Sequence, residues 1–175
     1  MIDVAVEAHD RTDEAVRSLL VTRAEGAHRL ANWILHDALA AEDAVQEAAL
    51  LAWARRRSLR GIDSFDAWFN RILVNVCRGE LRRRAKAPAV RVIEPITDGP
   101  HDRLPARDEL TTAILTLTPD EQIVVALRFG RDLTVPQIAA ETGIAEGTVK
   151  SRLHSALEHL RAALEAGRRA EETLR

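Results

Sequence analysis

Four polar side chains at helical spacing could contact a nucleic-acid backbone. Arg71, Asn75, Arg78 and Arg82 recur every three or four residues, so they share one stripe of a helix. Guanidinium groups bind phosphate oxygens, and the Trp and two Phe nearby suit stacking on unpaired bases. A solvated basic face would have the same spacing. The net charge of +8 between residues 54 and 91 favours nucleic-acid binding over that alternative.

A second polar group lies on a predicted recognition helix. Residues 134–142 predict a short helix, Gly143 predicts a turn, and residues 146–166 predict a last helix, which is helix-turn-helix spacing. The last helix is expected to expose side chains that suit phosphates and base edges, namely Lys150, Ser151, Arg152, His154 and Ser155. An ordinary helical hairpin with a solvated basic face is the alternative, and we favour DNA binding.

A third stripe is acidic and lies on a predicted helix over residues 39–57. Asp43, Gln46, Glu47 and Leu50 share one side of that helix. An acidic stripe beside a basic segment could dock a protein. Taken alone, such a stripe is more typical of a solvated face.

Catalytic and metal-binding chemistry is not expected. The six histidines have no metal-ligand spacing with one another or with acids, and there is no glycine-rich phosphate loop. Cys77 is the only cysteine, so an internal disulfide is excluded, and we expect a packed thiol in a reducing cytoplasm. We therefore expect no enzyme, no cofactor and no metal.

The elements that must position these side chains are predicted to be helices. The chain has 175 residues, of which 46% are hydrophobic and only 3% aromatic, and Ala is abundant, which favours an all-α fold. Gly26 could break the first helix, and Gly130 is expected at the C′ position after a helix that ends at Phe129. The expected helices cover residues 12–35, 39–57, 64–84, 108–117, 118–129, 134–142 and 146–166.

Four of the six prolines lie between residues 85 and 105, which is incompatible with a helix and predicts a linker. We expect two small helical domains at residues 10–84 and 107–167, joined by a Pro-containing linker at 85–106. About 20 linker residues reach roughly 65 Å when extended, so the domains could occupy separate sites. Whether the free protein packs them together is left open by the sequence.

Membrane insertion and secretion are not expected. The longest apolar run, residues 48–54, is far too short to span a bilayer. The acidic N-terminal residues do not resemble a secretory signal. We expect a cytoplasmic protein.

Three motifs together resemble a known family. The stretch from Ala41 to Trp53, the stretch Ser64–Phe69 followed by Asn75 and Leu81-Arg82-Arg83, and the string Gly147-Thr148-Val149-Lys150-Ser151-Arg152-Leu153 occur in this order. Their order and spacing resemble those of the extracytoplasmic-function (ECF, group 4) bacterial RNA polymerase sigma factors. The resemblance implies that the two expected domains are sigma region 2 and sigma region 4, the latter with the helix-turn-helix.

The resemblance also implies a function and partners. It implies binding to the RNA polymerase core, through the β′ clamp coiled coil and the β subunit, and promoter-specific initiation of transcription at −10 and −35 elements. An anti-sigma factor is a common further partner in the family. When active, such a protein associates with the nucleoid.

The resemblance assigns roles to three sets of residues. The implied core-binding residues are Asp43, Gln46, Glu47 and Leu50. The implied −10 DNA-binding residues, in the loop after Trp53 and the third helix, are Arg56, Arg57, Arg60, Arg71, Asn75, Arg78, Arg82 and Arg83. The implied −35 DNA-binding residues are Thr148, Lys150, Ser151, Arg152, His154 and Ser155.

Two other functions remain open at this point. A stand-alone helix-turn-helix regulator would bind operators by itself, with residues 1–84 as a sensor, but a sensor does not need a basic face in its last helix. A sigma-like adaptor that binds only proteins would keep the acidic stripe, but it does not need Arg71, Arg78, Arg82 or Lys150.

Overall fold

The computed structural model describes the backbone of residues 3–86 and 105–173 and the side chains of residues 13–86 and 109–170; within these ranges every regular element is helical. The α-helices are α1 (Asp3–Leu35), α2 (Ala38–Arg55), α3 (Phe65–Lys86), α4 (Pro105–Leu115), α5 (Pro119–Val125), α6 (Val135–Thr142) and α7 (Glu146–Thr173). Two 3-10 turns, η1 (Arg56–Ser58) and η2 (Ile62–Ser64), separate α2 from α3, and a π-helical turn, η3 (Ala126–Gly130), follows α5. The predicted all-α fold is confirmed.

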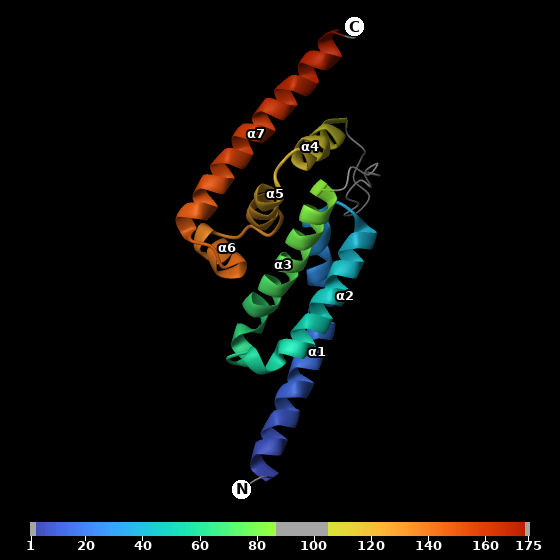
Figure 1. Cartoon of the computed structure of the whole chain (residues 1–175). Helices are drawn as coiled ribbons and strands as arrows, with labels where there is room; N and C mark the ends of the chain where they lie inside the picture. Colours follow the sequence, from blue (N-terminus) through green and yellow to red (C-terminus); the bar gives the residue numbers. More distant parts are fainter. Residues whose placement is uncertain (1–2, 87–104, 174–175) are drawn as a thin grey trace.

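Helices α1, α2 and α3 form an up-down-up bundle (Figure 1). Helix α2 packs through small residues, because its buried side chains are all alanines, at Ala41, Ala44, Ala48 and Ala52. Small side chains let helix axes approach closely. The opposite side of α2 faces solvent. Phe65 and Phe69 of α3 stack in the bundle core with ring centroids 5.6 Å apart.

The C-terminal half consists of α4 to α7, with α7 on the outside of the molecule (Figure 1). A small apolar cluster, which includes Leu117, Val125 and Leu160, holds α4 and α5 against α7. Helix α6, the turn at Gly143 and the start of α7 form the helix-turn-helix, and Ile138 and Val149 are fully buried in it.

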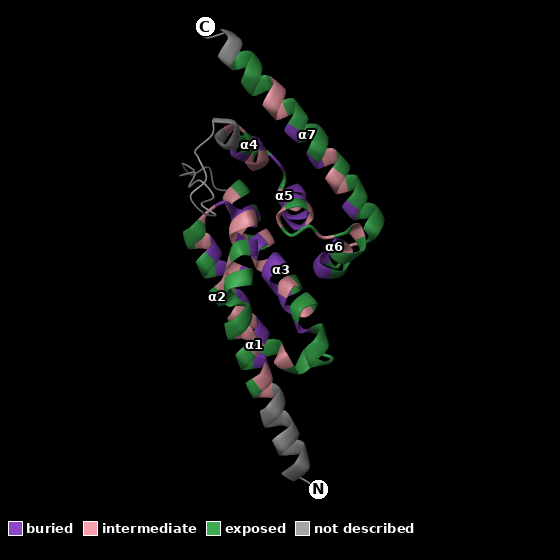
Figure 2. Ribbon diagram, turned by 180° about the vertical axis from the view of Figure 1, so that it is seen from behind, coloured by how far each residue is buried: buried purple, intermediate pink, exposed green. Residues whose placement is uncertain are grey.

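The two halves pack directly against each other. Helix α3 lies between α1 and α2 on one side and α5 and α6 on the other, so it is buried on two sides (Figure 2). The larger apolar core is continuous across this boundary, from Leu30 and Leu73 in the first half to Leu127 and Ile138 in the second. The expected division at residues 84 and 107 stays a prediction, because the chain between residues 86 and 105 lies outside the described residues.

The predicted helix starts near residues 118 and 134 and the predicted turn at Gly143 are confirmed. Thr118 caps α5, and Glu121 completes a capping box by accepting hydrogen bonds from the Thr118 backbone and hydroxyl. Gln137 accepts the same two hydrogen bonds from Thr134 at the start of α6. Gly143 has φ +71°, as the expected left-handed turn requires.

Other local predictions are wrong. Helix α1 begins at Asp3, well before residue 12, and it continues through Gly26 without a break. Gly130 is not left-handed, since the positive φ values of described glycines are at Gly61 and Gly143. It is small for another reason, which is its contact with Trp33. Pro105, expected in the linker, instead begins α4, because proline fits the first turn of a helix. The other expected linker prolines, at 88, 95 and 100, lie outside the described residues. Among the helices of the described ranges, we find none with the length and apolar character needed to cross a membrane.

Candidate polymerase and nucleic-acid interfaces

The acidic stripe lies on the solvent side of α2. Asp43, Gln46, Glu47 and Leu50 are all exposed, and 72% of Leu50 is accessible to solvent. They face away from the buried alanines of the same helix, as the periodicity predicts. An exposed Leu beside two carboxylates is a combination that suits a protein partner with basic and apolar groups.

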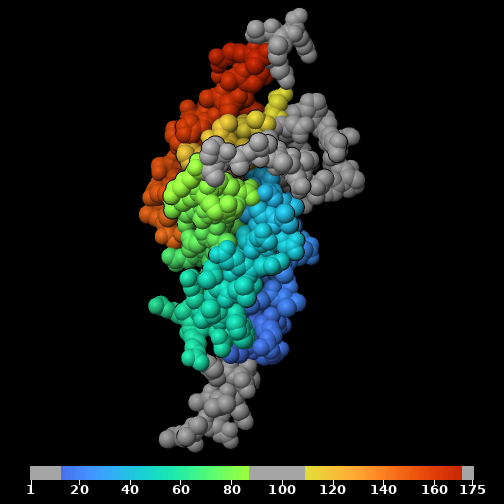
Figure 3. All heavy atoms as spheres, turned by 45° about the vertical axis from the view of Figure 1, so that its right-hand side comes forward, coloured from blue at the N-terminus to red at the C-terminus, as the bar shows by residue number. Residues whose placement is uncertain are grey.

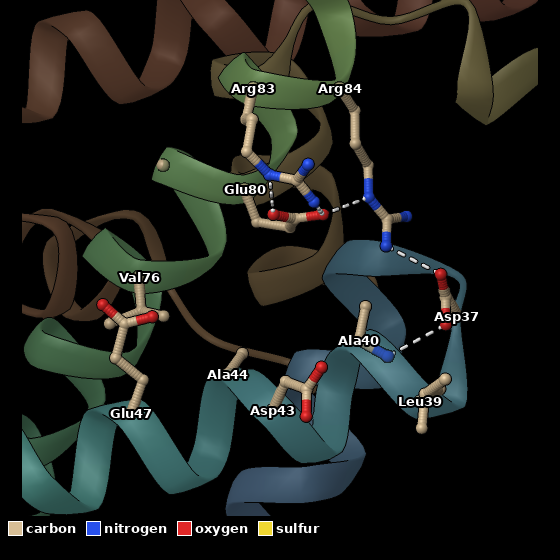
Figure 4. Close-up of a pocket in the computed structure, with 11 residues that line it drawn as sticks. Asp37, Leu39, Ala40, Asp43, Ala44, Glu47, Val76, Glu80, Arg83 and Arg84 are labelled. Atoms are coloured by element: carbon tan, nitrogen blue, oxygen red, sulfur yellow. Dashed lines mark hydrogen bonds and ion pairs between the residues drawn. The ribbon is translucent and has the colours of Figure 1, made fainter. Parts of the chain in front are cut away.

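A groove of about 490 Å³ runs between the start of α2 and the end of α3, and Asp43 and Glu47 line it (Figure 4). Its far side carries Glu80, which accepts hydrogen bonds from Arg83 at 2.7 and 2.8 Å and from Arg84 at 2.6 Å. These bonds, led by that from Arg83, lower the pKa of Glu80. Within the described part of the chain, no ion pair involves Asp43 or Glu47. The two carboxylates of the stripe are therefore available to a partner.

The segment after α2 carries the expected −10 arginines of the loop. Arg57 and Arg60 are exposed, and in the space-filling view the teal segment around this loop extends side chains away from the body (Figure 3). Arg56 differs, because its guanidinium stacks over the ring of Trp53 at 4.3 Å from the centroid and its Nε donates to Asp13 at 2.7 Å. Arg17 lies over the same ring at 5.1 Å. Arg56 thus joins the end of α2 to α1, and two guanidinium groups contact the Trp53 ring.

The basic stripe of α3 is only partly free. Arg71, Asn75 and Arg82 are exposed, as expected. The side chain of Arg78 is only 15% exposed, because its Nε donates to the carboxylate of Asp120 on α5 at 3.0 Å. Its terminal nitrogen also donates to the Asn75 side chain at 2.6 Å. Arg83, at the edge of the stripe, is held by Glu80.

The recognition helix presents most of its expected face to solvent. Thr148, Lys150, Ser151 and His154 are exposed at the start of α7. The hydroxyl of Ser151 donates to the Thr148 carbonyl at 3.0 Å, a local bond that a DNA acceptor could replace. A helix with a free polar face and two buried anchors, Ile138 and Val149 beneath it, is the arrangement that a major-groove helix requires.

Two residues expected on this face are not fully exposed. The Arg152 guanidinium pairs with Asp120 at 3.1 Å and is 28% exposed. The Ser155 hydroxyl donates to Glu121 at 2.6 Å, so it joins α7 to α5. The expectation that both belong to the exposed face is wrong, because α5 lies beside the first turns of α7. Their roles toward DNA stay predictions.

Glu121 is the polar centre of the C-terminal half. It is only 5% exposed, and burial alone would raise its pKa. Hydrogen bonds donated by Ser155, by the backbone and hydroxyl of Thr118, and by His159 outweigh that effect and lower the pKa of Glu121 to about 2. The carboxylate therefore stays charged and fixes the orientation of the recognition helix.

Metal binding has no support in the described residues, since no cluster of three or more His, Cys, Asp or Glu side chains occurs among them. Cys77 is fully buried, and burial raises the pKa of its thiol to about 12. The thiol is consequently protonated and unreactive at neutral pH.

Comparison with known proteins decides the family. Residues 9–87 match Sigma-70 region 2, and residues 113–162 match Sigma-70, region 4. The chain is 32% identical over 157 residues to the ECF RNA polymerase sigma factor SigL of Mycobacterium tuberculosis, which covers 86% of this chain and 89% of that protein. The chain belongs to the ECF RNA polymerase sigma factors. This sigma factor therefore serves promoter-specific initiation of transcription by RNA polymerase.

Two further relatives agree. The sigma factor is 31% identical over 154 residues to the RNA polymerase sigma factor SigV of Bacillus subtilis, with 85% of this chain and 92% of that protein covered. It is 30% identical over 148 residues to the RNA polymerase sigma-E factor of Streptomyces coelicolor, with 83% of each covered.

The fold recurs in solved structures. The sigma factor RpoE, crystallised with the anti-sigma factor NepR from Bartonella quintana, aligns with a TM-score of 0.65 at 24% identity, over 85% of this chain and 96% of that one. CnrH, in complex with the cytosolic domain of CnrY, aligns with a TM-score of 0.60 at 21% identity, over 86% and 88%. At these identities the likeness concerns the fold.

The sequence alone missed three residues that define the contact between the halves. Val74 is fully buried although it lies beside the basic stripe, and Asp120 pairs with arginines of both halves. Glu141 of α6 accepts a hydrogen bond from Asn70 of α3 at 3.2 Å. An apolar residue among arginines at helical spacing, here Val74, is a sequence signal that this side of a helix packs against another element.

Proposed function

We propose that this sigma factor divides its task among three surfaces. The exposed stripe of α2 (Asp43, Gln46, Glu47 and Leu50) docks on the β′ clamp coiled coil of the polymerase core. The loop after Trp53 and the basic stripe of α3 contact the −10 element, including its opened bases. The exposed start of α7 contacts the −35 element. The two halves, near residues 10–84 and 107–167, act as separate domains when they hold these sites.

One observation carries this proposal: the region 2 and region 4 matches occupy different halves of one chain, and each half presents the kind of surface that its role needs. Region 2 carries an acidic surface beside an arginine-rich one, and region 4 carries a polar recognition helix. Such a protein needs no catalytic group of its own, because the polymerase performs the chemistry.

The partners follow from the same division. Core polymerase and promoter DNA are the two obligatory partners, so the protein acts in the cytoplasm and at the nucleoid. The solved structures of RpoE and CnrH are complexes, that of RpoE with an anti-sigma factor. We extend this to an anti-sigma partner for this chain.

Site-specific photocrosslinking tests the division. A photoreactive amino acid replaces Glu42 beside the acidic stripe, Ser58 in the loop, or Leu157 beside the recognition face, all of which are exposed. With core polymerase and promoter DNA, we expect position 42 to crosslink to β′, position 58 to the −10 strand and position 157 to the −35 duplex. Ser18 on α1 is the control position. Two outcomes would favour a stand-alone regulator instead. One is crosslinking of position 42 to DNA, and the other is crosslinking of position 157 to DNA with the same yield in the presence and absence of core.

A further inference from the structure

The face of α3 beside the basic stripe is covered by the C-terminal half. Val74 is fully buried between Arg71 and Arg78, which precede and follow it by about one helical turn. Arg78 reaches Asp120 on α5, and Asn70, one turn before Val74, donates to Glu141 on α6. This side of α3 therefore faces α5 and α6, as Figure 2 also shows.

The turn of the helix-turn-helix rests on an arginine of the same stripe. An ideal Cβ at Gly143 would lie 2.7 Å from Cζ of Arg71, so the guanidinium is in contact with the glycine backbone. A residue proposed to contact the −10 element is thereby pressed against the unit proposed to contact the −35 element.

Asp120 is the point where the arginines of both halves meet. Its carboxylate lies 3.0 Å from Arg78 and 3.6 Å from Arg82, both on α3, and 3.1 Å from Arg152 on α7. A carboxylate offers guanidinium groups the same kind of anionic oxygen acceptors as a DNA phosphate does. An arginine directed at Asp120 in this geometry is not directed at DNA.

We propose that Asp120 acts as an internal phosphate mimic that holds the free sigma factor closed. In the closed form the Asp120 carboxylate pairs with Arg78 and Arg82 of the proposed −10 surface. Helices α5 and α6 cover Val74, which lies beside these arginines. DNA phosphates and Asp120 compete for the same guanidinium groups, so binding to the −10 strand requires the halves to separate. This inference rests on the proposed −10 role of the α3 stripe.

The closed form leaves the core-binding stripe accessible. Asp43, Gln46, Glu47 and Leu50 are exposed although α5 and α6 are docked on α3. The polymerase core can therefore engage the closed form first, and separation of the halves follows. This order restricts DNA binding by sigma factor that has no polymerase.

A distance measurement in the full-length chain tests this latch, the contact of Asp120 with Arg78 and Arg82. Fluorescent labels are attached to cysteines introduced at exposed Ser18 on α1 and exposed Ala162 on α7. Native Cys77 does not interfere, because it is fully buried and its thiol pKa is raised to about 12. The test variant is Asp120→Asn, which keeps the shape and removes the charge. The matched control is Asp132→Asn, since Asp132 is 97% exposed, pairs with Arg128 of the same half and has a left-handed φ that Asn also adopts.

We expect Asp120→Asn to raise the population of separated halves about three- to tenfold, with an equal gain in affinity for a short mixed-sequence single-stranded DNA. Asp132→Asn should change neither. Rising salt should separate the halves of the wild type, because partly exposed ion pairs are screened, and should affect Asp120→Asn much less. Wild-type distance and DNA affinity in a folded Asp120→Asn protein would overturn the latch.

A second variant avoids α5 altogether. Asn70→Asp places a carboxylate against that of Glu141 across the boundary, so it should also separate the halves. If Asp120→Asn fails to fold, Asn70→Asp and the salt titration of the wild type decide the inference. Halves that stay closed in both experiments would overturn it.

Failure of the latch differs from failure of the proposed function. A closed Asp120→Asn protein whose transcription with core still needs Arg78 and Arg82 would refute the latch alone. If the halves of Asp120→Asn separate without any gain in DNA affinity, Asp120 does not block DNA binding. That result would also refute the proposed −10 role of the α3 stripe.

Discussion

Gly130, at the end of η3, lies against the face of the Trp33 indole of α1. An ideal Cβ on Gly130 would stand 2.8 Å from Cδ2 and 2.9 Å from Cε3 of Trp33, closer than real Cβ contacts. These are atoms of the rigid ring, so a small rotation of the side chain does not remove the overlap. The two halves therefore meet here without room for a methyl group.

Gly130→Ala should weaken the contact between the halves. We expect a loss of about 1–3 kcal/mol in the free energy of unfolding, the usual effect of overpacking. Gly26→Ala is the control with the opposite sign: Gly26 is inside α1 with nothing within 4 Å of an added Cβ, so the change should stabilise by about 0.5–1 kcal/mol. Urea unfolding measured by tryptophan fluorescence checks both. Equal stability of Gly130→Ala and wild type would contradict the packing described here.

His36 should make folding sensitive to mild acid. It is 5% exposed, its Nδ1 has no hydrogen-bond partner, and burial lowers its pKa. The unfolded chain therefore binds a proton below about pH 6.5, where folded His36 stays neutral, and stability falls as the pH decreases from there. Burial raises the pKa of Glu141, which acts in the opposite sense, and the lowered pKa of Glu121 acts only below about 4.5.

The matching variant is His36→Asn, because Asn tolerates the φ of +51° at this position. Its urea midpoint should fall less than that of the wild type as the pH decreases through 6.5. Parallel curves for the two proteins would assign the acid sensitivity to other groups.

The acidic stripe should control binding to the core. Asp43→Arg combined with Glu47→Arg should weaken association by a few kcal/mol, since reversed charges face the partner surface. The fold should survive, because both side chains are exposed. Glu25→Arg on α1, with a side chain 84% exposed, is the control for a charge reversal elsewhere. Co-purification with core at wild-type affinity would show that the stripe is an ordinary solvated face.

The arginines of α3 should act on DNA. Arg78→Ala with Arg82→Ala should leave core binding intact and weaken open-complex formation, and each lost phosphate contact should reduce the salt slope by about one. The matched control is Arg29→Ala with Arg161→Ala, two exposed arginines that pair within their own helices. A slope identical to that of the wild type would leave Arg78 and Arg82 with a purely structural role.

Local structure was largely predictable because its determinants are local. The helix start at residue 118 and the turn at Gly143 depend on neighbouring residues alone, and both are as expected. The exposure of the α2 stripe follows from helical periodicity. Gly26 misled the prediction, because one glycine within a long, well-packed helix costs only about 1 kcal/mol.

The contact between the halves was not predictable from local pattern. Val74, Asp120 and Gly130 each have an ordinary local explanation, as a helix residue, a first-turn acid and a helix end. The partner of Asp120 is far from it in the sequence, since its hydrogen bond from Arg78 joins residues 42 apart. A local sequence pattern carries no information about such a contact. The same packing half-buries Arg152 and Ser155, which periodicity alone places on an exposed face.

The exposed start of α7 should select the −35 sequence. Lys150→Ala and Ser151→Ala should each relax preference at one base pair, at a cost of about 1–3 kcal/mol for the best site. Arg152→Ala should weaken binding to all −35 sequences about equally, because the Arg152 guanidinium already pairs with Asp120. Selection from a promoter library randomised at −35, with core present, distinguishes the two patterns. An unchanged selected sequence for both Lys150→Ala and Ser151→Ala would remove this helix from base recognition.

Transcription by purified core polymerase on genomic DNA, with and without this protein, shows whether the protein directs the polymerase to promoters. We predict new transcripts that appear only with the protein and whose start sites share sequence elements near −10 and −35. The Asp43→Arg, Glu47→Arg variant should abolish them. The same set of start sites with and without the protein would contradict a role in promoter-specific initiation, and sequence-specific binding of promoter duplex without core would identify a stand-alone regulator.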